Sequence, residues 1–257
     1  MVAPTREQGC VWITGASSGI GRELAHVLAA EGWTLAVSAR REAALSELAA
    51  EIGGGVHAYP VDVTDGEVVA ATVERIEAEV APIALAVLNA GTHIETDASA
   101  VRPDVHRQLM AANHFSAIDA LAALLPRMRE RGAGRICVVA SVAGYRGMPT
   151  AAAYSASKAA TIAAFESYAG ELAGTGVDLQ VANPGFVETP LTARNTFTMP
   201  MLMPVDKAAR KLARGLKSRR FEIVFPWAFC MAVKLYRCLP YALAMRLARG
   251  MARQRGL

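Results

Sequence analysis

Short apolar runs of strand length alternate with longer, helix-like segments along the first 190 residues. Strands separated by helices form parallel sheets, because a parallel pair needs a long crossover connection. Several of the runs are apolar throughout, which indicates strands buried on both faces. We therefore predict an α/β fold, a doubly wound parallel sheet of about seven strands with helices on both faces. The runs lie at 10–14, 34–38, 56–61, 83–88, 135–140 and 177–182, and a seventh follows at 221–225.

The length and composition of the chain indicate how it is divided. With 257 residues, 53% of them hydrophobic, it fits one large α/β domain. No repeat, low-complexity tract or linker interrupts it before residue 190. We predict a single domain over 1–225, with a substrate lid at about 190–215, and an apolar and basic helical extension over 226–257. A basic helix is expected at 207–218, capped by Asp206.

The cysteines and the N-terminus bear on the cellular compartment. Cys10, Cys137, Cys230 and Cys238 lie far apart, and none has metal-ligand or CxxC spacing. The first residues lack the apolar core of a signal peptide. We expect a reducing, cytoplasmic environment, no disulfides and no metal site.

A glycine-rich turn follows the first strand and opens the first helix. Gly15, Gly19 and Gly21 are spaced as G-x-x-x-G-x-G, and Ser17 and Ser18 lie between them. Glycines let the backbone approach a pyrophosphate closely, and the N-terminus of a helix stabilises its charge. Serine hydroxyls can add hydrogen-bond donors. The position of the motif predicts a Rossmann-type dinucleotide site in preference to an ordinary turn.

The residues after the second strand bear on the choice of dinucleotide. An acidic residue there would bind a ribose 2′-hydroxyl and repel a 2′-phosphate. This chain has Arg40 and Arg41 instead, and a guanidinium matches a phosphate with paired donors. NADP(H) is therefore expected, and NAD(H) is less favoured. The alternative is that both arginines are simply exposed at the start of a helix.

A tyrosine and a lysine lie four residues apart in a predicted helix at 152–170. Tyr154 and Lys158 therefore share one side of that helix. The pKa of a free phenol is about 10, and a neighbouring ammonium favours the phenolate. The spacing alone is a weak signal, because it arises often by chance. Ser141 follows the fifth strand, at the sheet edge where ligands bind in open α/β sheets.

Taken together, these residues resemble the short-chain dehydrogenase/reductase family, in its branch of roughly 250-residue chains. The resemblance covers residues 10–190, where all the motifs stand in the family's order and spacing. One motif would be weak, whereas the whole set in register is a strong indication. The residues that carry it are Thr14, Gly15, Ser17, Ser18, Gly19, Ile20 and Gly21; Asp62 and Val63; Asn89, Ala90 and Gly91; Asn113; Ser141; Tyr154 and Lys158; and Pro184, Gly185, Val187 and Thr189.

The resemblance implies a catalytic set of Asn113, Ser141, Tyr154 and Lys158. Tyr154 would exchange a proton with the substrate oxygen, and Ser141 would hydrogen-bond the same oxygen. Lys158 would lower the pKa of Tyr154 and bind the nicotinamide ribose. Asn113 would hold a water that links Lys158 to solvent.

The resemblance also implies which loops contact the cofactor. Asp62 and Val63 would meet the adenine edge, and the backbone from Pro184 to Thr189 would meet the nicotinamide carboxamide. Asn89 ends the fourth strand at the ligand-binding edge of the sheet, where it could instead tie loop backbones together.

The C-terminal part of the chain departs from the family pattern. Residues 1–205 carry a formal net charge of −7, whereas residues 206–257 carry +11. Three methionines and two prolines at 196–204 fit either an adaptable apolar lid or a surface crossover. The uncharged stretch at 223–233 is too short to cross a bilayer.

Three readings of the extension stay open. An apolar segment with Trp227 precedes a helix in which Arg246, Arg249 and Arg253 recur at helical spacing. This pattern fits peripheral contact with an anionic membrane, which would lie at the inner face of a cytoplasmic membrane. It also fits a cover for the substrate cleft or a contact with a second subunit. No nucleic-acid partner is expected, because no binding module is recognised.

The function that we expect is hydride transfer between NADP(H) and a carbonyl or secondary alcohol. The apolar lid and extension favour a lipophilic small molecule, such as a 3-oxoacyl chain, a steroid-like alcohol or a retinoid-like aldehyde. The alternative is a catalytically silent NADP-binding regulator or scaffold, which the intact catalytic set disfavours. The resemblance implies a homodimer or homotetramer, formed through the long helices predicted at 103–131 and 152–170.

Overall fold

The computed structural model describes residues 4–195 and 197–254. Thr196, which belongs to the predicted lid, lies outside the described residues. So do residues 1–3, at the start of the predicted domain, and residues 255–257, at the end of the predicted extension.

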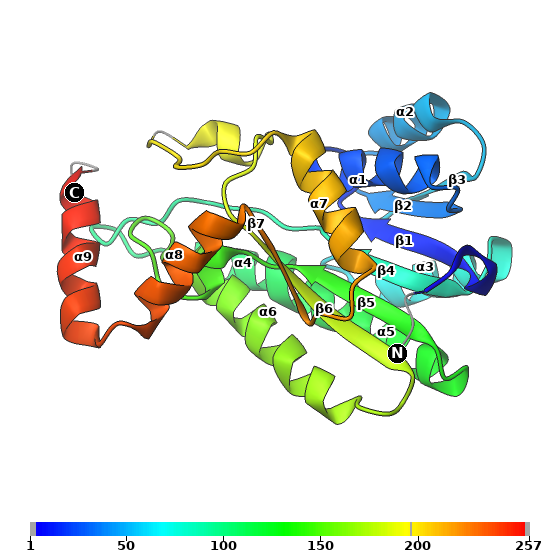
Figure 1. The fold of residues 1–257 in the computed structure, drawn as a ribbon. Coiled ribbons are helices and arrows are strands. Elements are labelled where there is room, and N and C mark those ends of the chain that lie inside the picture. The colour runs from blue at the N-terminus through cyan, green and yellow to red at the C-terminus, as the bar shows by residue number, and fades with distance from the viewer. Residues whose placement is uncertain (1–3, 196, 255–257) are drawn as a thin grey trace.

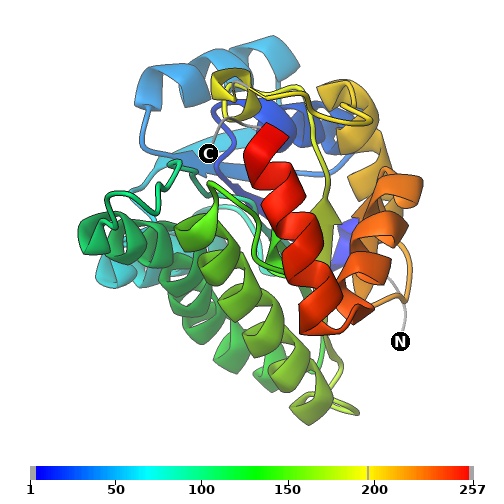
Figure 2. The same ribbon diagram turned by 90° about the vertical axis from the view of Figure 1, so that its left-hand side faces the viewer.

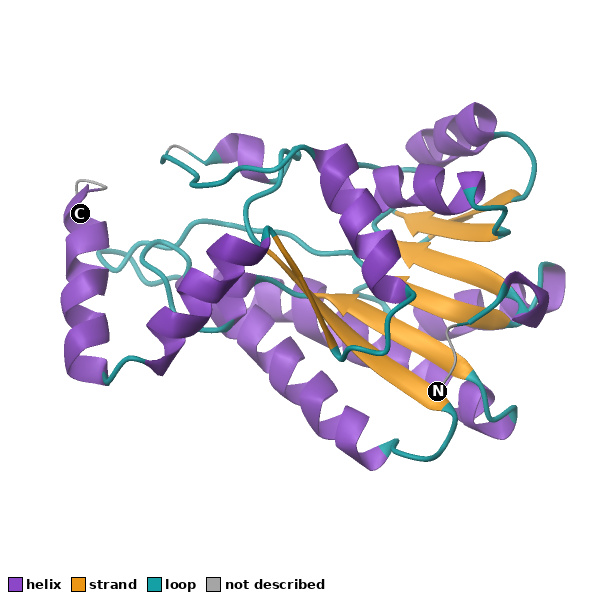
Figure 3. Ribbon diagram, viewed as in Figure 1, coloured by secondary structure: helices purple, strands orange, loops and turns teal. Residues whose placement is uncertain are grey.

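A parallel sheet of seven strands forms the centre of the molecule (Figures 1 and 3). Its order is β3-β2-β1-β4-β5-β6-β7, so the direction of winding reverses between β1 and β4. The predicted α/β class and doubly wound sheet are confirmed. The strands are β1 (Cys10–Thr14), β2 (Leu35–Ala39), β3 (Val56–Pro60), β4 (Ile83–Leu88), β5 (Gly134–Val139), β6 (Val177–Pro184) and β7 (Glu222–Phe225).

Helices cover both faces of the sheet, and each face has its own hydrophobic core. Leu24, Leu28 and Leu212 belong to the first core, and Leu124 and Phe165 belong to the second. Full burial of such a side chain contributes roughly 1.5–3 kcal/mol. The first face carries α1 (Gly19–Ala30), α2 (Glu42–Ile52) and α7 (Val205–Leu216), and the second carries α3 (Gly66–Glu79), α5 (Ser116–Glu130) and α6 (Ala152–Glu171).

The long helix predicted at 103–131 contains a change of winding. α4 (Pro103–Met110) passes through a π-helical turn, Ala111–Phe115, into α5. The turn contains Asn113, which is buried, and such turns are frequent at functional sites. By length and hydropathy the segment Pro103–Glu130 also resembles a membrane span. Core helices pass the same test, and the inner side of this one is buried in the second core.

The segment predicted as a lid, 190–215, includes a helix of the core. α7 belongs to the first core, where its buried side packs against α1 and includes Ala209 and Leu212. That the loop at 190–204 covers a substrate stays a prediction, and we call this segment the lid loop. Because α7 begins at Val205 after Pro204, Asp206 is not its cap but lies in its first turn, paired with Arg210.

Two helices follow the last strand, so the predicted extension is helical. α8 (Trp227–Cys238) packs beside β7, and α9 (Tyr241–Gln254) comes after a short turn. The strands all point toward the end of the molecule that carries α9 (Figures 1 and 3). Seen from that end, α9 stands in front of the carboxyl edge of the sheet (Figure 2).

Candidate active site

Ser141, Tyr154 and Lys158 come from two neighbouring elements at the carboxyl edge of the sheet. Ser141 follows β5 and caps a short 3-10 helix, accepting a hydrogen bond from the Ala143 amide at 3.1 Å. Tyr154 and Lys158 lie near the start of α6, with Lys158 Nζ 5.9 Å from the centroid of the Tyr154 ring. A Cβ added at Gly144 would lie 2.8 Å from the Lys158 carbonyl carbon. Glycine therefore lets the serine loop approach α6 closely.

Burial determines how this tyrosine and lysine ionise. It raises the pKa of Tyr154, and hydrogen bonding with Ser141 offsets part of that rise. Burial also lowers the pKa of Lys158 to about 8. That Lys158 lowers the pKa of Tyr154 stays a prediction; in this structure desolvation of the phenolate is the dominant effect on that pKa, and Ser141 supplies the opposing one. Tyr154 is therefore a phenol, and a proton donor, at neutral pH.

Asn113 fastens the loop that follows β4. Its Oδ1 accepts a hydrogen bond from the Thr92 amide at 2.7 Å, and its Nδ2 donates to Thr92 O and Ser157 Oγ at 3.0 Å each. A Cβ added at Gly91 would lie 3.0 Å from Asn113 Oδ1 and 3.3 Å from Lys158 Nζ. Gly91, Asn113 and Lys158 thus meet closely, and a larger residue at position 91 would crowd both side chains.

The glycine-rich turn joins β1 to α1 at the point where the strand order reverses. Gly15 and Gly19 have φ angles of 67° and 58°, which other residues rarely adopt. A Cβ at Gly21 would lie 2.5 Å from Asn89 Nδ2. That amide donates to the carbonyls of Thr14 and Gly15 at 3.1 and 3.2 Å. Asn89 therefore ties together the loops after β1 and β4, which is the alternative role considered for it.

The segment after β6 lies opposite this turn. A Cβ at Gly19 would lie 3.2 Å from Thr189 Cγ2, so the two segments approach closely. Val187 is buried and bridges to Met203 of the lid loop. Pro184 is the last residue of β6, so the predicted residues of this segment begin at the carboxyl edge of the sheet.

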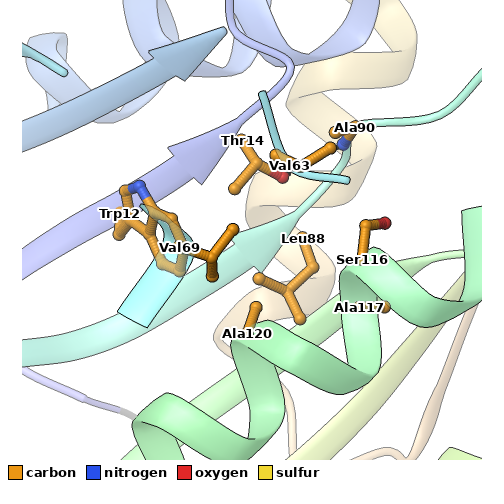
Figure 4. Close-up of a pocket in the computed structure, with 9 residues that line it drawn as sticks. All are labelled: Trp12, Thr14, Val63, Val69, Leu88, Ala90, Ser116, Ala117 and Ala120. Atoms are coloured by element: carbon orange, nitrogen blue, oxygen red, sulfur yellow. Dashed lines mark hydrogen bonds between the residues drawn. The ribbon is translucent and has the colours of Figure 1, made fainter. Parts of the chain in front are cut away.

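A small pocket lies beside the ends of β1 and β4 (Figure 4). Val63 and Ala90, both predicted cofactor residues, lie on its wall. Asp62 Oδ1 accepts hydrogen bonds from the amide and hydroxyl of Thr64 at 3.0 and 2.8 Å, and these lower the pKa of Asp62. The pocket is lined by Trp12, Thr14, Val63, Val69, Leu88, Ala90, Ser116, Ala117 and Ala120.

The two arginines after β2 differ in their contacts. Arg41 Nη2 donates to the carbonyl and the hydroxyl of Ser17, at 3.1 Å each. Arg40 is exposed, and its charge contributes to the low pKa of Asp62. Ser18 is the N-cap of α1 but makes no side-chain capping bond, so its hydroxyl is available to a ligand. Positive charge therefore lies between β2 and the glycine-rich turn.

His93 lies at the site although the sequence did not single it out. Its ring meets Tyr154 edge-on, with centroids 4.9 Å apart and planes at 72°. Within the described chain, its Nδ1 is buried without a hydrogen-bond partner. Burial lowers the pKa of His93, so the ring is neutral at pH 7. The one available signal was its position two residues after Gly91.

Aromatic side chains connect the site to the lid loop and to α8. Phe186, after β6, contacts Phe197 of the lid loop and Phe229 of α8, with centroids 5.7 and 5.4 Å apart. A Cβ added at Gly185 would lie 2.6 Å from the Phe229 ring. α8 is therefore in direct contact with the loop that follows β6.

Comparison with known proteins places this arrangement in a family. Residues 9–199 match the short chain dehydrogenase family. An uncharacterized oxidoreductase of Myxococcus xanthus is 38% identical over 240 residues, which cover 92% of this chain and 95% of that protein. Ketoacyl reductase HetN of Nostoc sp. is 32% identical over 221 residues, covering 83% of this chain and 77% of that protein.

A solved structure is also similar to this chain. It is a short-chain dehydrogenase from Sphingobium yanoikuyae in complex with NADPH, with a TM-score of 0.78 at 27% identity. The similarity covers 91% of this chain and 97% of that one. The chain therefore belongs to the short-chain dehydrogenase/reductase family and is an oxidoreductase of the NAD(P)(H)-using type.

Proposed function

We propose that this protein is an NADP(H)-dependent enzyme that interconverts a carbonyl and a secondary alcohol. The observation that carries the proposal is the meeting of Ser141, Tyr154 and Lys158 at the carboxyl edge of the sheet, beside the glycine-rich turn. The positive φ angles of Gly15 and Gly19, just before the N-terminus of α1, suit a loop that binds the phosphates of a dinucleotide. Bound NADPH would supply the hydride.

Each catalytic side chain has a role that its contacts support. In the direction of reduction, Tyr154 donates its proton to the carbonyl oxygen, which gains negative charge as hydride reaches the carbon. Ser141 Oγ already accepts from the Ala143 amide, so its hydroxyl proton can bind the same oxygen. Lys158, with a pKa of about 8, resupplies the proton that Tyr154 gives up. Asn113 keeps the adjoining loop in place through its bonds to Thr92 and Ser157, and we expect the water that links Lys158 to solvent to lie beside it.

The preference for NADP(H) rests on the charge at the end of β2. Arg41 already contacts the Ser17 loop, and Arg40 lies next to it in the chain, so both can reach a 2′-phosphate. No carboxylate occupies residues 38–41, where a ribose 2′-hydroxyl would need one. The NADPH complex of the Sphingobium yanoikuyae protein supports the same cofactor.

A lipophilic substrate is supported by the wall of the site. Phe186, Phe197 and Phe229 form an aromatic group next to the nucleotide site, and Met203 is buried beside them. Such a wall favours an apolar chain or ring over a small polar ketone. The relative named a ketoacyl reductase makes 3-oxoacyl compounds the first class to test.

The test is a cofactor-oxidation assay over short and long ketones, aldehydes and 3-oxoacyl thioesters, with NADPH and NADH in parallel. Tyr154→Phe should lower kcat by about 10²- to 10⁴-fold, because it removes the donated proton and keeps the ring. NADPH binding, followed by fluorescence titration, should stay near wild type. Wild-type rates in the Tyr154→Phe variant would disprove the catalytic assignment. NADPH binding without turnover of any compound would favour the regulator or scaffold.

A further inference from the structure

The outer side of α8 is apolar from end to end. Cys230 and Val233 face the body of the protein and are buried. Trp227 and Leu235, on the opposite side, are 67% and 72% exposed. A surface helix that is apolar on both sides is unusual unless something covers the second side. The exposed residues at helical spacing on this outer side are Trp227, Ala228, Ala232, Leu235 and Cys238, and none is charged.

α9 carries an exposed apolar row next to a row of arginines. Leu243 and Leu247, one turn apart, are 49% and 52% exposed. Arg246, Arg249 and Arg253 follow at helical spacing on a neighbouring side, and all three are exposed. Among the described residues, no carboxylate pairs with them. The helix therefore presents leucines and free guanidiniums side by side.

The corner between the two helices is held in place by Arg146, from the loop after Ser141. Its Nη1 donates to the carbonyls of Tyr236, Arg237 and Leu239, at 3.2, 2.8 and 3.0 Å. Its guanidinium also lies over the Tyr241 ring, 4.8 Å from the centroid. These contacts fix the end of α8 and the start of α9 to the body.

Charge selects the kind of partner that could cover this surface. No Asp or Glu occurs from 223 to 257, and Lys234 is already paired with Glu222. A second copy that used the same patch would bring arginines against arginines, because such an interface is self-complementary. A partner must therefore combine negative charge with an apolar layer in which the exposed leucines and Trp227 can be buried.

We propose that α8 and α9 form a docking surface for an anionic lipid bilayer. The leucines and Trp227 would enter the boundary between headgroups and acyl chains, and the arginines would bind lipid phosphates. Because α9 stands in front of the carboxyl edge of the sheet (Figure 2), a docked molecule would turn its candidate active site toward the bilayer. This last consequence, and with it direct uptake of a lipophilic substrate, rests on the proposed function. Docking itself does not.

The experiment is flotation of the full chain with phosphatidylcholine vesicles that contain or lack 30% phosphatidylglycerol, at low and high salt. Arg246→Glu/Arg249→Glu should weaken binding by about 30-fold or more, since each basic residue contributes about 1 kcal/mol near such a surface. Arg219→Glu/Arg220→Glu is the matched control. It changes the net charge equally at two exposed residues outside both helices, and should bind nearly as wild type.

Leu243→Ser/Leu247→Ser, which keeps every charge, should also weaken binding. NADPH oxidation with a water-soluble carbonyl should be unchanged in all three variants, so loss of docking is separable from loss of catalysis. Equal loss in both charge-reversed variants would mean adsorption by net charge alone and would overturn the proposal. Absence of binding to anionic vesicles would do the same. A third outcome would also overturn the proposal: the wild type is an oligomer by sedimentation and the Arg246→Glu/Arg249→Glu variant dissociates. The surface would then be a protein interface.

Discussion

Burial of Lys158, which the proposed chemistry uses, lowers the stability of the fold. It is 4% exposed, and its ammonium donates one hydrogen bond, to the Val139 carbonyl at 2.8 Å. A cation buried with so little compensation loses much of its hydration energy. The lowered pKa, about 8, measures that loss. A lysine is kept there at a cost to folding.

Lys158→Met should therefore raise the free energy of unfolding by about 2 kcal/mol at pH 7, which is the desolvation cost less about one hydrogen bond. The folded pKa of about 8 lies below the unfolded value, so the unfolded wild type holds more protons between pH 8 and about 10.4. Wild-type stability thus rises over that window. The advantage of Lys158→Met should be largest below pH 8 and shrink toward pH 10 in urea denaturation.

The control for that series is Lys207→Met, at an exposed lysine of α7. It should show no comparable change at any pH. A Lys158→Met variant that is less stable than wild type at pH 7, by an amount that does not vary with pH, would show that burial of the cation is not costly.

His93 makes a second prediction at the scale of one residue. Its neutral ring holds a buried, unpaired Nδ1 beside Tyr154, where it can bind a polar group next to the substrate carbonyl. His93→Phe keeps the edge-on ring but removes the nitrogen. KM for 3-oxoacyl thioesters should rise about tenfold with kcat nearly unchanged, because one hydrogen bond is lost. KM for simple ketones should hardly change. An equal effect on both classes would mean that His93 only supports Tyr154 by packing.

At the scale of elements, one carboxylate joins α8 to the sheet and to the loop after Ser141. Glu222 of β7 accepts hydrogen bonds from Tyr145, Lys234 and Asn183, the last at 2.8 Å. These partners come from the loop after Ser141, from α8 and from β6. Burial acts to raise the pKa of Glu222, but the three donors outweigh it and the pKa is lowered. The same carboxylate thus joins α8 to the candidate active site.

Glu222→Gln should loosen α8 without unfolding the sheet. The amide keeps the shape but loses the charge that attracts Lys234, so amide hydrogen exchange at 227–238 should quicken by about tenfold. A lowered folded pKa adds stability above the unfolded value, about 4.3, which is lost as pH falls through the folded value. Wild type and variant should therefore converge near pH 3. Glu166→Gln, at an exposed and unpaired residue of α6, should leave the exchange of α8 unchanged.

The elements differ in how well the sequence could predict them. β1 and β4 have the predicted bounds, because apolar runs are local signals. The π turn at Ala111–Phe115 has no such signal, since its winding depends on how Asn113 is held by Thr92 and Ser157. The predicted lid included residues 205–215, whereas α7 buries alanines and leucines in the first core, and that packing depends on its contact with α1.

The side-chain contacts in the candidate site could also be predicted only in part. The meeting of Ser141, Tyr154 and Lys158 was predictable, because the ends of parallel strands share one edge. The position of His93 was not, because it depends on the path of an irregular loop. Arg135 was read as part of an apolar strand, yet it is 1% exposed and pairs with Asp178 at 2.8 Å. Pairing across strands, which a single sequence does not display, makes that burial tolerable.

At the scale of the whole molecule, the two cores share one sheet, whereas the C-terminal helices are added at its edge. The seven strands and the helices that cover them bury side chains on both faces of the sheet, so this body should unfold cooperatively. α8 contributes a small third cluster, built from Cys230 and Val233 against Val142 and Tyr145. In α9, Ala244 is the one described side chain that is fully buried. Attachment to the body therefore weakens along the chain.

Two shortened chains should separate these contributions. A chain ending at Pro240 loses α9 and little buried area, so its Tm should fall by no more than about 2 °C, with NADPH binding retained. A chain ending at Pro226 also loses Cys230 and Val233 from their cluster and leaves Glu222 without Lys234. Two buried apolar side chains contribute about 3–6 kcal/mol, and 1 kcal/mol shifts Tm by about 2–4 °C in a chain of this size. Its Tm should therefore fall by roughly 10 °C or more in calorimetry. An equal fall in both chains would mean that α9, and not α8, supports the edge of the sheet.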